Sequence, residues 1–411
     1  MKDAGKTQIY LVSGIVAVSI FGDALLYAVL PADPGFFHIK IWQTGILLGA
    51  NRLVRLISNE IAGRVVQKSE SPAPLIAALV IGGLITLSYA LPFGFYWLLC
   101  GRILWGFSWS VLRIEGYTTL LRNSETGNRG TFFAVYQAIV RLGQGGAVLA
   151  GGVLCDLIGI SSTYILLGGI TLGSGLVLIY FLQAARAAPL DEGAENTLSG
   201  VPGSDAAAEP PGNSSLPFLL WICGFSIATF EQMTANLSGR IVADIIHPAL
   251  PVSMGIATIT GILLGFHSFS SFFIGPAVGF VSDRIGRKLV FRYVLLLNGV
   301  SLLGLLIFRS WILILTTLLL QFASGVSARL LIYIIAGDCS PGRDPALHMS
   351  RFATCIDLGT ALAPLLAFSL YAKAGLWAVI PAALVLVFSA LFSIPKHVQE
   401  QERIGFPDRP E

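Results

Sequence analysis

Charged residues are scarce in this chain of 411 residues: Asp, Glu, Lys and Arg make up only 12% of it, against about 25% in soluble domains. Hydrophobic residues make up 55%. This balance excludes an ordinary water-soluble protein and indicates a membrane protein. The apolar runs are continuous instead of alternating, which favours transmembrane helices over barrel strands.

Residues that carry enzyme chemistry are few and scattered. The five cysteines include no CxxC pair, so the sequence predicts no disulfide framework and no clustered metal site. It contains neither a nucleotide-binding Walker loop nor a Gly-x-Ser-x-Gly elbow. We therefore expect no enzymatic activity and no cofactor.

Windows of about 20 apolar residues, the length that crosses the hydrocarbon core as a helix, predict twelve transmembrane helices. These are residues 8–31, 42–66, 73–95, 96–121, 130–154, 160–185, 216–246, 253–280, 288–308, 311–336, 347–372 and 375–395. The first run is too long for a secretory signal and lacks its cleavage pattern, so it is counted as a mature helix. The predicted class is an all-α polytopic membrane protein.

A segment of different composition separates the sixth and seventh predicted helices. It is rich in Ala, Gly, Pro, Ser and acidic residues, as flexible linkers are. We therefore predict four parts along the chain. They are a six-helix bundle at 1–185, a cytoplasmic linker at 186–215, a second six-helix bundle at 216–396 and a cytoplasmic tail at 397–411.

The two halves share a repeat. The hexapeptide TGILLG occurs at Thr44–Gly49 and again at Thr260–Gly265. We call the shift in numbering from Thr44 to Thr260 the repeat offset. The same offset aligns the stretch that begins at Arg141 with the stretch that begins at Asp357. Two pseudo-symmetric bundles in one orientation follow from such a duplication, as in the parallel repeats of one large class of transporters.

Basic residues predict the orientation. Most Lys and Arg lie in loops on one side of the predicted membrane, and the other side holds Lys40, Arg309 and Lys373. The positive-inside rule then places both termini in the cytoplasm, and the short loops favour a bacterial inner membrane. The net charge of +3 is spread over loops instead of forming one stripe, so no nucleic-acid partner is expected. We expect a monomer.

The loop after the eighth predicted helix reads GFVSDRIGRK, from Gly279 to Lys288. It resembles the signature loop of the major facilitator superfamily, which has Gly, three residues, Asp-Arg, one residue and Gly-Arg-Arg/Lys. With the twelve helices and the duplication, the resemblance covers essentially the whole chain. It implies two six-helix bundles around a central cavity and secondary transport by alternating access. It also implies a gating role for the loop residues Gly279, Asp283, Arg284, Gly286, Arg287 and Lys288.

In that superfamily the loop Asp latches the cytoplasmic ends of the two halves. We therefore expect Asp283 to interact with the start of the fifth helix near Arg129 and Gly130, where a carboxylate meets the positive end of a helix. The first half departs from the pattern, because Gln67 stands where the superfamily has the Asp. Alternatively, the basic residues of the loop set topology alone, and both roles are compatible.

Charged residues inside the predicted transmembrane helices are the most informative about function. An ionisable group at that depth costs several kcal/mol unless it faces a water-filled cavity or a partner. The third, sixth and twelfth predicted helices carry no charged residue, and the ninth carries one near its start. The helices that the resemblance places around the cavity carry nearly all the others.

Arginines dominate that set in the first half. A rise of about 1.5 Å per residue along a helix places Arg52 and Arg141 near mid-membrane, with Arg113 nearer the cytoplasm. Because guanidinium groups grip planar and tetrahedral oxyanions, we predict a substrate site at Arg52, Arg141 and Arg113 for a carboxylate or phosphate. Asp357 belongs to the same predicted site. Alternatively, Asp357 neutralises Arg141 as a gating pair.

Carboxylates at mid-membrane can take up protons when desolvation favours their neutral form. Asp23 and Glu231 fall at nearly equivalent places in the first and seventh helices, so we predict that they couple transport to protons, together with Glu115 nearer the cytoplasm. Structural hydrogen bonding is the alternative. His267 is interpreted as a packed or wet polar residue, with proton transfer or metal contact as its alternatives.

The predicted function is secondary active transport of a small organic anion or amphipathic metabolite, coupled to protons. A proton-driven exporter of drugs or siderophore-like compounds is the first alternative. A lipid-handling or metal-exporting membrane protein is a further alternative, and a non-transporting membrane sensor is disfavoured by the short loops.

Overall fold

The computed structural model describes residues 2–69, 71–123, 129–187, 215–250, 254–338 and 345–393. Within these ranges the chain is helical apart from short turns. Such a structure is expected for an apolar chain, because only a helix satisfies all its own backbone hydrogen bonds in lipid. The predicted linker and tail fall almost entirely outside the described residues, so their boundaries stay predictions.

Each half contains six membrane-crossing units. The first half comprises α1 (Lys2–Ser19), α2 (Phe21–Ala32), α3 (Ile41–Lys68), α4 (Ala73–Ser88), α5 (Phe95–Asn123), α6 (Arg129–Ile158) and α7 (Ile160–Ala187). The second comprises α8 (Ser215–Ile241) with the short turns η1 (Val242–Ile246) and η2 (His247–Ala249), then α9 (Ile256–Ile285), α10 (Arg287–Ile307), α11 (Trp311–Asp338), α12 (Pro345–Ala374) and α13 (Leu376–Phe392).

The count of twelve crossings agrees with the sequence prediction. Eight helical stretches, one of them running through both α1 and α2, are long and apolar enough to cross a membrane, and α4 and α13 are apolar but shorter. The remaining two, α3 and α5, are long but carry several charged residues. Since such charges need a cavity or a partner, α3 and α5 point to the place where a site is built.

Two predicted helices of the first half differ from the structure in their local geometry. The first is broken at Ile20, between α1 and α2, where the Ser19 hydroxyl donates back to the Val16 carbonyl, an arrangement that bends helices. The third ends at Ser88 instead of residue 95. Pro92 follows shortly after, and Pro cannot donate the backbone hydrogen bond that a longer helix needs.

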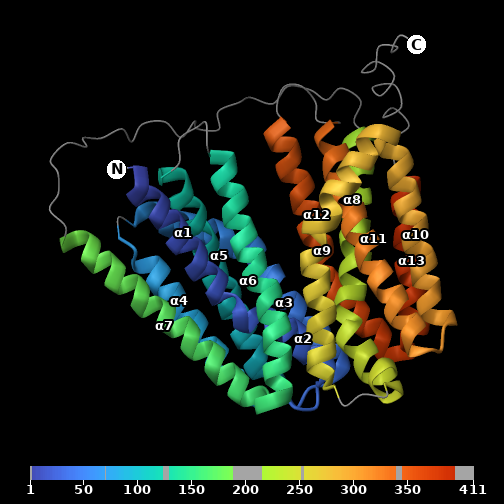
Figure 1. Ribbon diagram of the computed structural model, residues 1–411, viewed down its shortest axis with the longest axis horizontal. Coiled ribbons are helices and arrows are strands. Elements are labelled where there is room, and N and C mark those ends of the chain that lie inside the picture. Colours follow the sequence, from blue (N-terminus) through green and yellow to red (C-terminus); the bar gives the residue numbers. More distant parts are fainter. Residues whose placement is uncertain are drawn as a thin grey trace, which may run out of the picture.

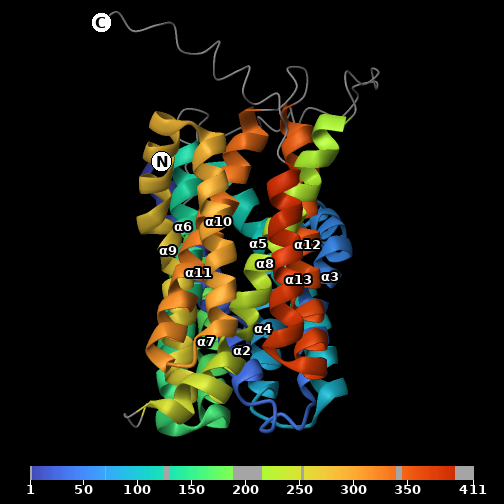
Figure 2. The same cartoon turned by 90° about the vertical axis from the view of Figure 1, so that its right-hand side faces the viewer.

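The two halves repeat each other. The helix pairs α5 and α11, α6 and α12, and α7 and α13 each begin one repeat offset apart. The halves stand side by side, and their ribbons diverge toward the end where α1 begins (Figure 1). Figure 2 shows the second half from its outer side. The all-α fold of two pseudo-symmetric six-helix bundles is therefore as the sequence predicts.

Glycines of the repeated hexapeptide hold the two halves together. A Cβ on Gly45 in α3 would lie 2.5 Å from the Pro364 carbonyl oxygen in α12, and a Cβ on Gly261 in α9 would lie 2.6 Å from the Val148 carbonyl oxygen in α6. Both contacts cross between halves, and the repeat offset converts one into the other. Such close backbone approach requires glycine, so TGILLG marks the symmetric interface.

One end of the interface carries a further link. The carboxylate of Asp156, near the end of α6, accepts a hydrogen bond of 2.6 Å from the Thr258 backbone amide in the first turn of α9. A Cβ on Gly255 would clash with the same carboxyl group. We call this end, defined by Asp156, Gly255 and Thr258, the closed end. The opposite end, where α3 and α9 finish at Lys68 and Ile285, is called the open end.

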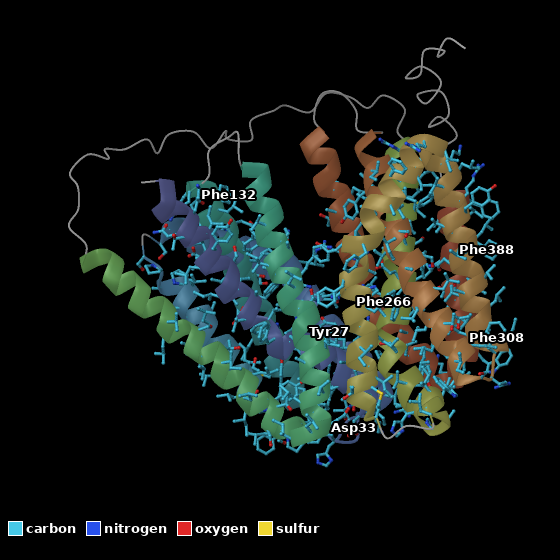
Figure 3. The ribbon with its side chains drawn as sticks, viewed as in Figure 1. Tyr27, Asp33, Phe132, Phe266, Phe308 and Phe388 are labelled. Carbon is cyan, nitrogen blue, oxygen red and sulfur yellow. The ribbon has the colours of Figure 1, made fainter. Side chains whose placement is uncertain are left out.

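The outer surface is apolar. Phe308 and Phe388 point away from the second half at its outer edge (Figure 3), and Phe392 is 82% exposed. Soluble monomers rarely expose broad patches of large apolar side chains. A surface of this kind suits a lipid surrounding. Tyr27, in contrast, lies at the centre, between the halves (Figure 3).

Candidate functional site

A cavity of about 410 Å³ lies between the two halves, within the size range of small-molecule sites. Both halves contribute polar lining residues. From the first half come Tyr27, Arg52, Arg141 and Gln144, and from the second come Glu231, Gln232, Asn236, His267, Ser327, Arg329 and Tyr333. A site shared in this way changes shape when the halves move.

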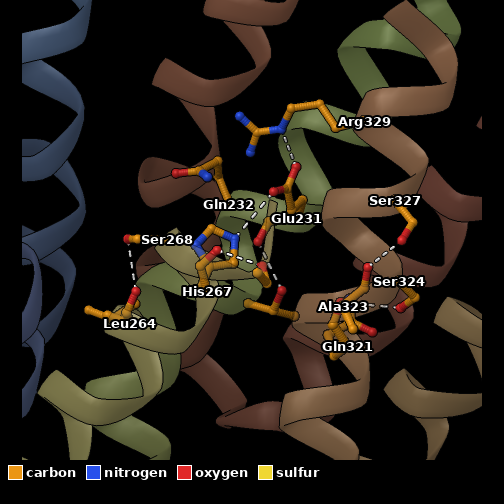
Figure 4. Close-up of polar contacts among 12 residues, drawn as sticks. Glu231, Gln232, Leu264, His267, Ser268, Gln321, Ala323, Ser324, Ser327 and Arg329 are labelled. Atoms are coloured by element: carbon orange, nitrogen blue, oxygen red, sulfur yellow. Dashed lines mark hydrogen bonds and ion pairs between the residues drawn. The ribbon is translucent and has the colours of Figure 1, made fainter. Parts of the chain in front are cut away.

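Three ionisable side chains of the second half form one cluster on the cavity wall (Figure 4). Glu231 in α8 accepts a hydrogen bond of 2.5 Å from Nε of Arg329 in α11, and its other oxygen lies 3.2 Å from Nε2 of His267 in α9. The Glu231 side chain is 3% exposed, whereas Arg329 is 29% exposed. The carboxylate is therefore covered by groups that themselves reach the cavity.

The first half contains a matching cluster, here called sealed because neither Asp23 nor Arg102 lines the cavity. Asp23 in α2 is ion-paired with Arg102 in α5, whose side chain has no exposed surface. Asn51 donates a hydrogen bond of 3.1 Å to the same carboxylate, and Nε of Arg102 donates to the Leu47 carbonyl oxygen at 3.0 Å. All three groups are thus hydrogen-bonded, as a buried ion pair requires, and the Asp23 side chain is 10% exposed.

The two clusters are related by the repeat, with one difference. Asn51 and His267 are one repeat offset apart, and each contacts the carboxylate of its own half. The arginines do not match, because the offset from Arg329 leads to Arg113 and not to Arg102. Duplicated positions therefore hold a neutral amide beside a sealed carboxylate in one half and a titratable imidazole beside a cavity carboxylate in the other.

Arg52 connects the halves at the cavity. Its Nη1 atom donates to Oε1 of Gln232 at 3.1 Å and to the Thr360 carbonyl oxygen at 2.9 Å. Its guanidinium also lies 5.3 Å from the ring centroid of Tyr27, a cation–π contact. These partners are neutral, so hydrogen bonds hold the guanidinium in place without cancelling its charge.

Asn236 adds a donor to the wall. It lines the cavity and is 4% exposed, and its side-chain nitrogen has no hydrogen-bond partner among the described residues. A buried donor without a partner costs free energy. Asn236 is therefore placed to donate to an acceptor atom of a bound molecule.

Only some of the residues that the sequence predicts for substrate binding and proton coupling line this cavity. Arg52, Arg141 and Glu231 line it together, whereas Asp23 is sealed beside Arg102. Arg113 and Glu115 are partly exposed on α5 and do not line it. Asp357 is exposed on α12, where it and Arg141 both act electrostatically on Tyr333. The roles predicted for these residues stay predictions.

The signature loop is described only in part. Gly286 has a φ of +102° and ends α9 while starting α10, a conformation that favours glycine. Arg284 lies 4.0 Å from the ring centroid of Phe280, Lys288 is 5% exposed, and Gly279 has open space where a Cβ would be. The structure describes neither the Asp283 side chain nor the side chains of its expected partners at the start of α6. The latch therefore stays a prediction.

The described residues contain no group of three or more His, Cys, Asp or Glu side chains that could hold a metal ion. Glu231 and His267 are two such groups in contact, and Glu231 also pairs with the Arg329 guanidinium, which is not a metal ligand. The cluster suits proton chemistry better than metal binding.

Comparison with known proteins decides the family. The model of the Major Facilitator Superfamily matches residues 12–238 and 220–408. The chain belongs to this superfamily. It is therefore a multi-pass integral membrane protein of a transporter family.

Two transporters resemble the chain at low identity. The human synaptic vesicular amine transporter is 23% identical over 274 residues, 64% of this chain and 48% of the relative. The mouse synaptic vesicular amine transporter is 24% identical over 148 residues, 36% of this chain and 29% of the relative. The matched part thus spans about half of the human relative's length and less of the mouse one.

Solved superfamily structures share the fold. A bacterial homolog of the human lysosomal transporter Spinster, inward-facing and occupied, has a TM-score of 0.69 at 12% identity, covering 94% of this chain and 92% of that one. Its inward-facing, unoccupied form has a TM-score of 0.68 at 13% identity, covering 95% and 92%. At such identities the likeness concerns architecture alone.

Sequence reasoning did not assign a role to several residues of the cavity. Gln232, Asn236 and Tyr333 carry no signal that separates them from packed polar side chains in an apolar helix. Arg329 was recognisable only as a charge in a spanning helix. The repeat offers one usable signal for these residues. It places Asn51 and His267 at equivalent positions of the two halves, so both are candidates for the same kind of contact.

Proposed function

We propose that this transporter moves a small organic anion by alternating access, with the central cavity as its binding site. The observation that carries the proposal is the charge of the cavity wall. Three arginines line it, Arg52, Arg141 and Arg329, with Glu231 as the one carboxylate among the described lining residues. An excess of guanidinium groups in a site of low dielectric favours an anion.

The polar lining fits a carboxylate or phosphate group. The hydrogen-bond partners of Arg52 are neutral and do not offset its charge, and Asn236 has a side-chain nitrogen without a partner among the described residues. Tyr27 and Tyr333 add apolar ring surface with polar tips. The substrate we propose therefore has one anionic group and a small organic body that fits about 410 Å³.

Proton coupling is proposed at Glu231. In the charged state Glu231 holds Arg329 by an ion pair and contacts His267. A proton on Glu231 removes the attraction for Arg329, and the guanidinium then turns its charge to the substrate. Proton and anion binding therefore favour each other. Asp23 is a weaker candidate for this step, because Arg102 and Asn51 cover it away from the cavity.

Orientation and state are part of the proposal. The positive-inside rule places Lys68 and Arg284, at the open end, on the cytoplasmic side, so we propose cytoplasmic termini. The short loops lead us to propose a bacterial inner membrane. The halves diverge at the open end (Figure 1) and touch at the closed end through Asp156 and Thr258. Together these features support an inward-facing state, and we propose that the protein is a monomer.

A cationic substrate is the second candidate, and the likeness to the vesicular amine transporters favours it. Thermal unfolding of the purified protein distinguishes the two, since a ligand of the folded state raises the melting temperature. We expect small carboxylates or phosphates to stabilise the wild type, and Arg52→Gln and Arg141→Gln to lose this effect.

The matched control is Arg64→Gln, because Arg64 lies on the same helix as Arg52 but forms an exposed ion pair with Glu60. This variant should respond to the anions as the wild type does. Stabilisation by organic amines that is undiminished in Arg52→Gln and Arg141→Gln would contradict the anion proposal and support the second candidate.

A further inference from the structure

One face of α11 contacts both Glu231 and His267. Phe322, Gly325 and Arg329 are three and four residues apart in α11, so they share one face of that helix. The ring centroids of Phe322 and His267 are 5.0 Å apart, and the rings meet edge to face. Arg329 donates to the Glu231 carboxylate at 2.5 Å (Figure 4). The position of the pair thus depends on this single helix face.

Gly325, the middle residue of that face, leaves room for the Glu231 side chain. A Cβ on Gly325 would lie 2.9 Å from Cγ of Glu231 and 3.5 Å from its Cβ. The first distance is well below the separation of about 3.5–4.0 Å at which carbon atoms pack. The Glu231 side chain is 3% exposed, so it has little space into which to withdraw. A side chain at position 325 would therefore push Glu231 away from its present path to Arg329.

The neighbours of Gly325 on its other side are polar and neutral. Its Cβ would lie 3.8 Å from Nδ2 of Asn298 in α10. Asn298 accepts a hydrogen bond of 3.1 Å from Gln321 and donates one of 3.0 Å to the Ser324 hydroxyl. These groups pair with one another and bring no charge, so they do not replace the arginine as a counter-charge for Glu231.

Few ionisable groups face Glu231 from the helices that pack against α8. Those that act on it are His267 on α9 and Arg329 and Tyr333 on α11. The other carboxylates near α8 have partners elsewhere or act on Arg329: Asp23 on α2, Asp244 in η1 and Asp357 on α12. The helix α13 has no ionisable residue. Arg329 is therefore the one permanent positive charge among the described groups in contact with Glu231.

The first half has the opposite arrangement at the equivalent positions of α5. The repeat offset leads from Phe322 to Gly106 and from Gly325 to Trp109, so the glycine and the aromatic residue change places. Trp109 is 8% exposed and stacks on Trp105, with ring centroids 6.5 Å apart. An indole ring thus stands where the second half has no side chain.

This exchange accompanies a difference in ion pairing between the halves. Arg102 and Arg113 lie on the same face of α5 as Trp109, one on each side of it. Asp23 pairs with Arg102, on the closed-end side of the indole. In the second half the carboxylate of α8 pairs instead with Arg329, the equivalent of Arg113, on the open-end side of the glycine. The glycine thus leaves open the side that the indole occupies in the first half.

From this geometry we infer that Gly325 is a positioning residue for proton coupling, because its lack of a side chain lets Glu231 reach Arg329. The inference rests on the role proposed for Glu231 and goes beyond it, since it assigns the behaviour of the cavity carboxylate to one exchanged position, Gly325 for Trp109. Gly325 does not line the cavity, so it acts through Glu231 and not on the substrate.

Proton uptake by Glu231 in the absence of any anion tests the inference. Infrared difference spectra of the purified full-length protein, stepped through pH, record the C=O band of protonated carboxyl groups, and the part that Glu231→Gln lacks belongs to Glu231. We expect Gly325→Ala to take up this proton about one pH unit higher than the wild type, because a carboxylate held farther from Arg329 loses a charge that favours its ionised form. The matched control is Gly299→Ala, whose Cβ would lie 3.9 Å from the nearest atom, in Leu384. It should titrate as the wild type does.

The outcomes separate the positioning role from the proposed proton coupling. The wild-type midpoint in Gly325→Ala would overturn the inference and leave proton coupling at Glu231 standing. If the wild type shows no band from Glu231 and Gly325→Ala shows one, the positioning role holds and the proposed coupling fails. Absence of the band from both proteins would contradict both.

Thermal melting decides the inference even if Gly325→Ala folds poorly. Glu231→Ala removes Cγ, so the nearest atom to a Cβ at position 325 would then be the Cβ of residue 231, at 3.5 Å. We expect Gly325→Ala to lower the melting temperature of the wild type but not that of Glu231→Ala, because the effects of changes at two residues in contact are not additive. An equal fall in both backgrounds would show that the added methyl group does not act through Glu231, and would overturn the inference.

Discussion

At the scale of single residues, the chain places two carboxylate–arginine pairs in opposite surroundings. Asp23 and Arg102 are sealed within the first half, and Glu231 and Arg329 face the cavity from the second. A sealed pair holds its geometry because removing either partner leaves an unpaired buried charge. A pair that faces a cavity can exchange its partner for a proton or a ligand. The same chemistry thus serves as a fixed support in one half and as a switch in the other.

The sealed pair predicts a large effect on stability. Asp23→Asn should lower the free energy of unfolding by about 3–5 kcal/mol, because Arg102 would remain buried without its counter-charge. Glu231→Gln should cost less, since Arg329 is 29% exposed and can turn to water. Thermal melting in one detergent compares the two variants. A melting temperature of Asp23→Asn equal to that of the wild type would show that Arg102 is compensated by other groups.

At the scale of helices, the repeated hexapeptide acts as a contact between halves. Gly261 in α9 and Gly45 in α3 each meet a backbone carbonyl of the opposite half. Gly265, one turn further along α9, would place its Cβ 3.6 Å from the nearest atom, an ordinary contact. In α9, therefore, replacement of glycine by alanine causes a clash at Gly261 and fits at Gly265.

Gly261→Ala should separate the halves at the closed end, because its methyl group would meet the Val148 carbonyl oxygen at 2.6 Å and overpacking costs about 1–3 kcal/mol. Spin labels at Leu157 and Arg309, placed in a chain whose native cysteines are replaced, report the distance across that end. We expect a longer distance in Gly261→Ala and an unchanged distance in Gly265→Ala. If both variants match the wild type, the glycine contact does not limit the closed state.

Helices and their symmetry were predictable from the sequence, and the pairing of side chains was not. Long apolar runs must be helical in lipid, and the repeat offset between the two TGILLG copies identified the duplication before any contact was known. Arg102 illustrates the limit, because its depth in α5 is readable but its partner Asp23 lies far away along the chain, in α2. The rotation of each helix about its own axis decides which of two nearby arginines pairs with a given carboxylate. The sequence does not determine that rotation closely enough to choose between them.

At the scale of the whole molecule, the two six-helix halves enclose one cavity that neither could form alone. Arg52 reaches from the first half to Gln232 and Thr360 in the second. The halves touch at the closed end and diverge toward the open end (Figure 1). Movement of one half against the other would expose the cavity to alternate sides, and it must break either the Arg52 bonds or the closed-end contacts.

Ligand binding should therefore change distances at the two ends in opposite directions. We expect an anion at low pH to shorten the distance between spin labels at Lys68 and Ile285, at the open end, and to lengthen that between Leu157 and Arg309. A ligand shifts such an equilibrium only by its differential affinity for the two states. Distances that do not respond to any stabilising anion would contradict alternating access about this cavity.

The central claim is that a proton on Glu231 frees Arg329 for an anion, and the affinity for that anion as a function of pH tests it most directly. Linkage requires that an anion that binds with one proton loses about tenfold in affinity for each pH unit above the range in which Glu231 is protonated. We predict this fall in the wild type and a flat, tight affinity in Glu231→Gln, which is neutral at every pH. An equal fall with pH in both proteins would contradict the account.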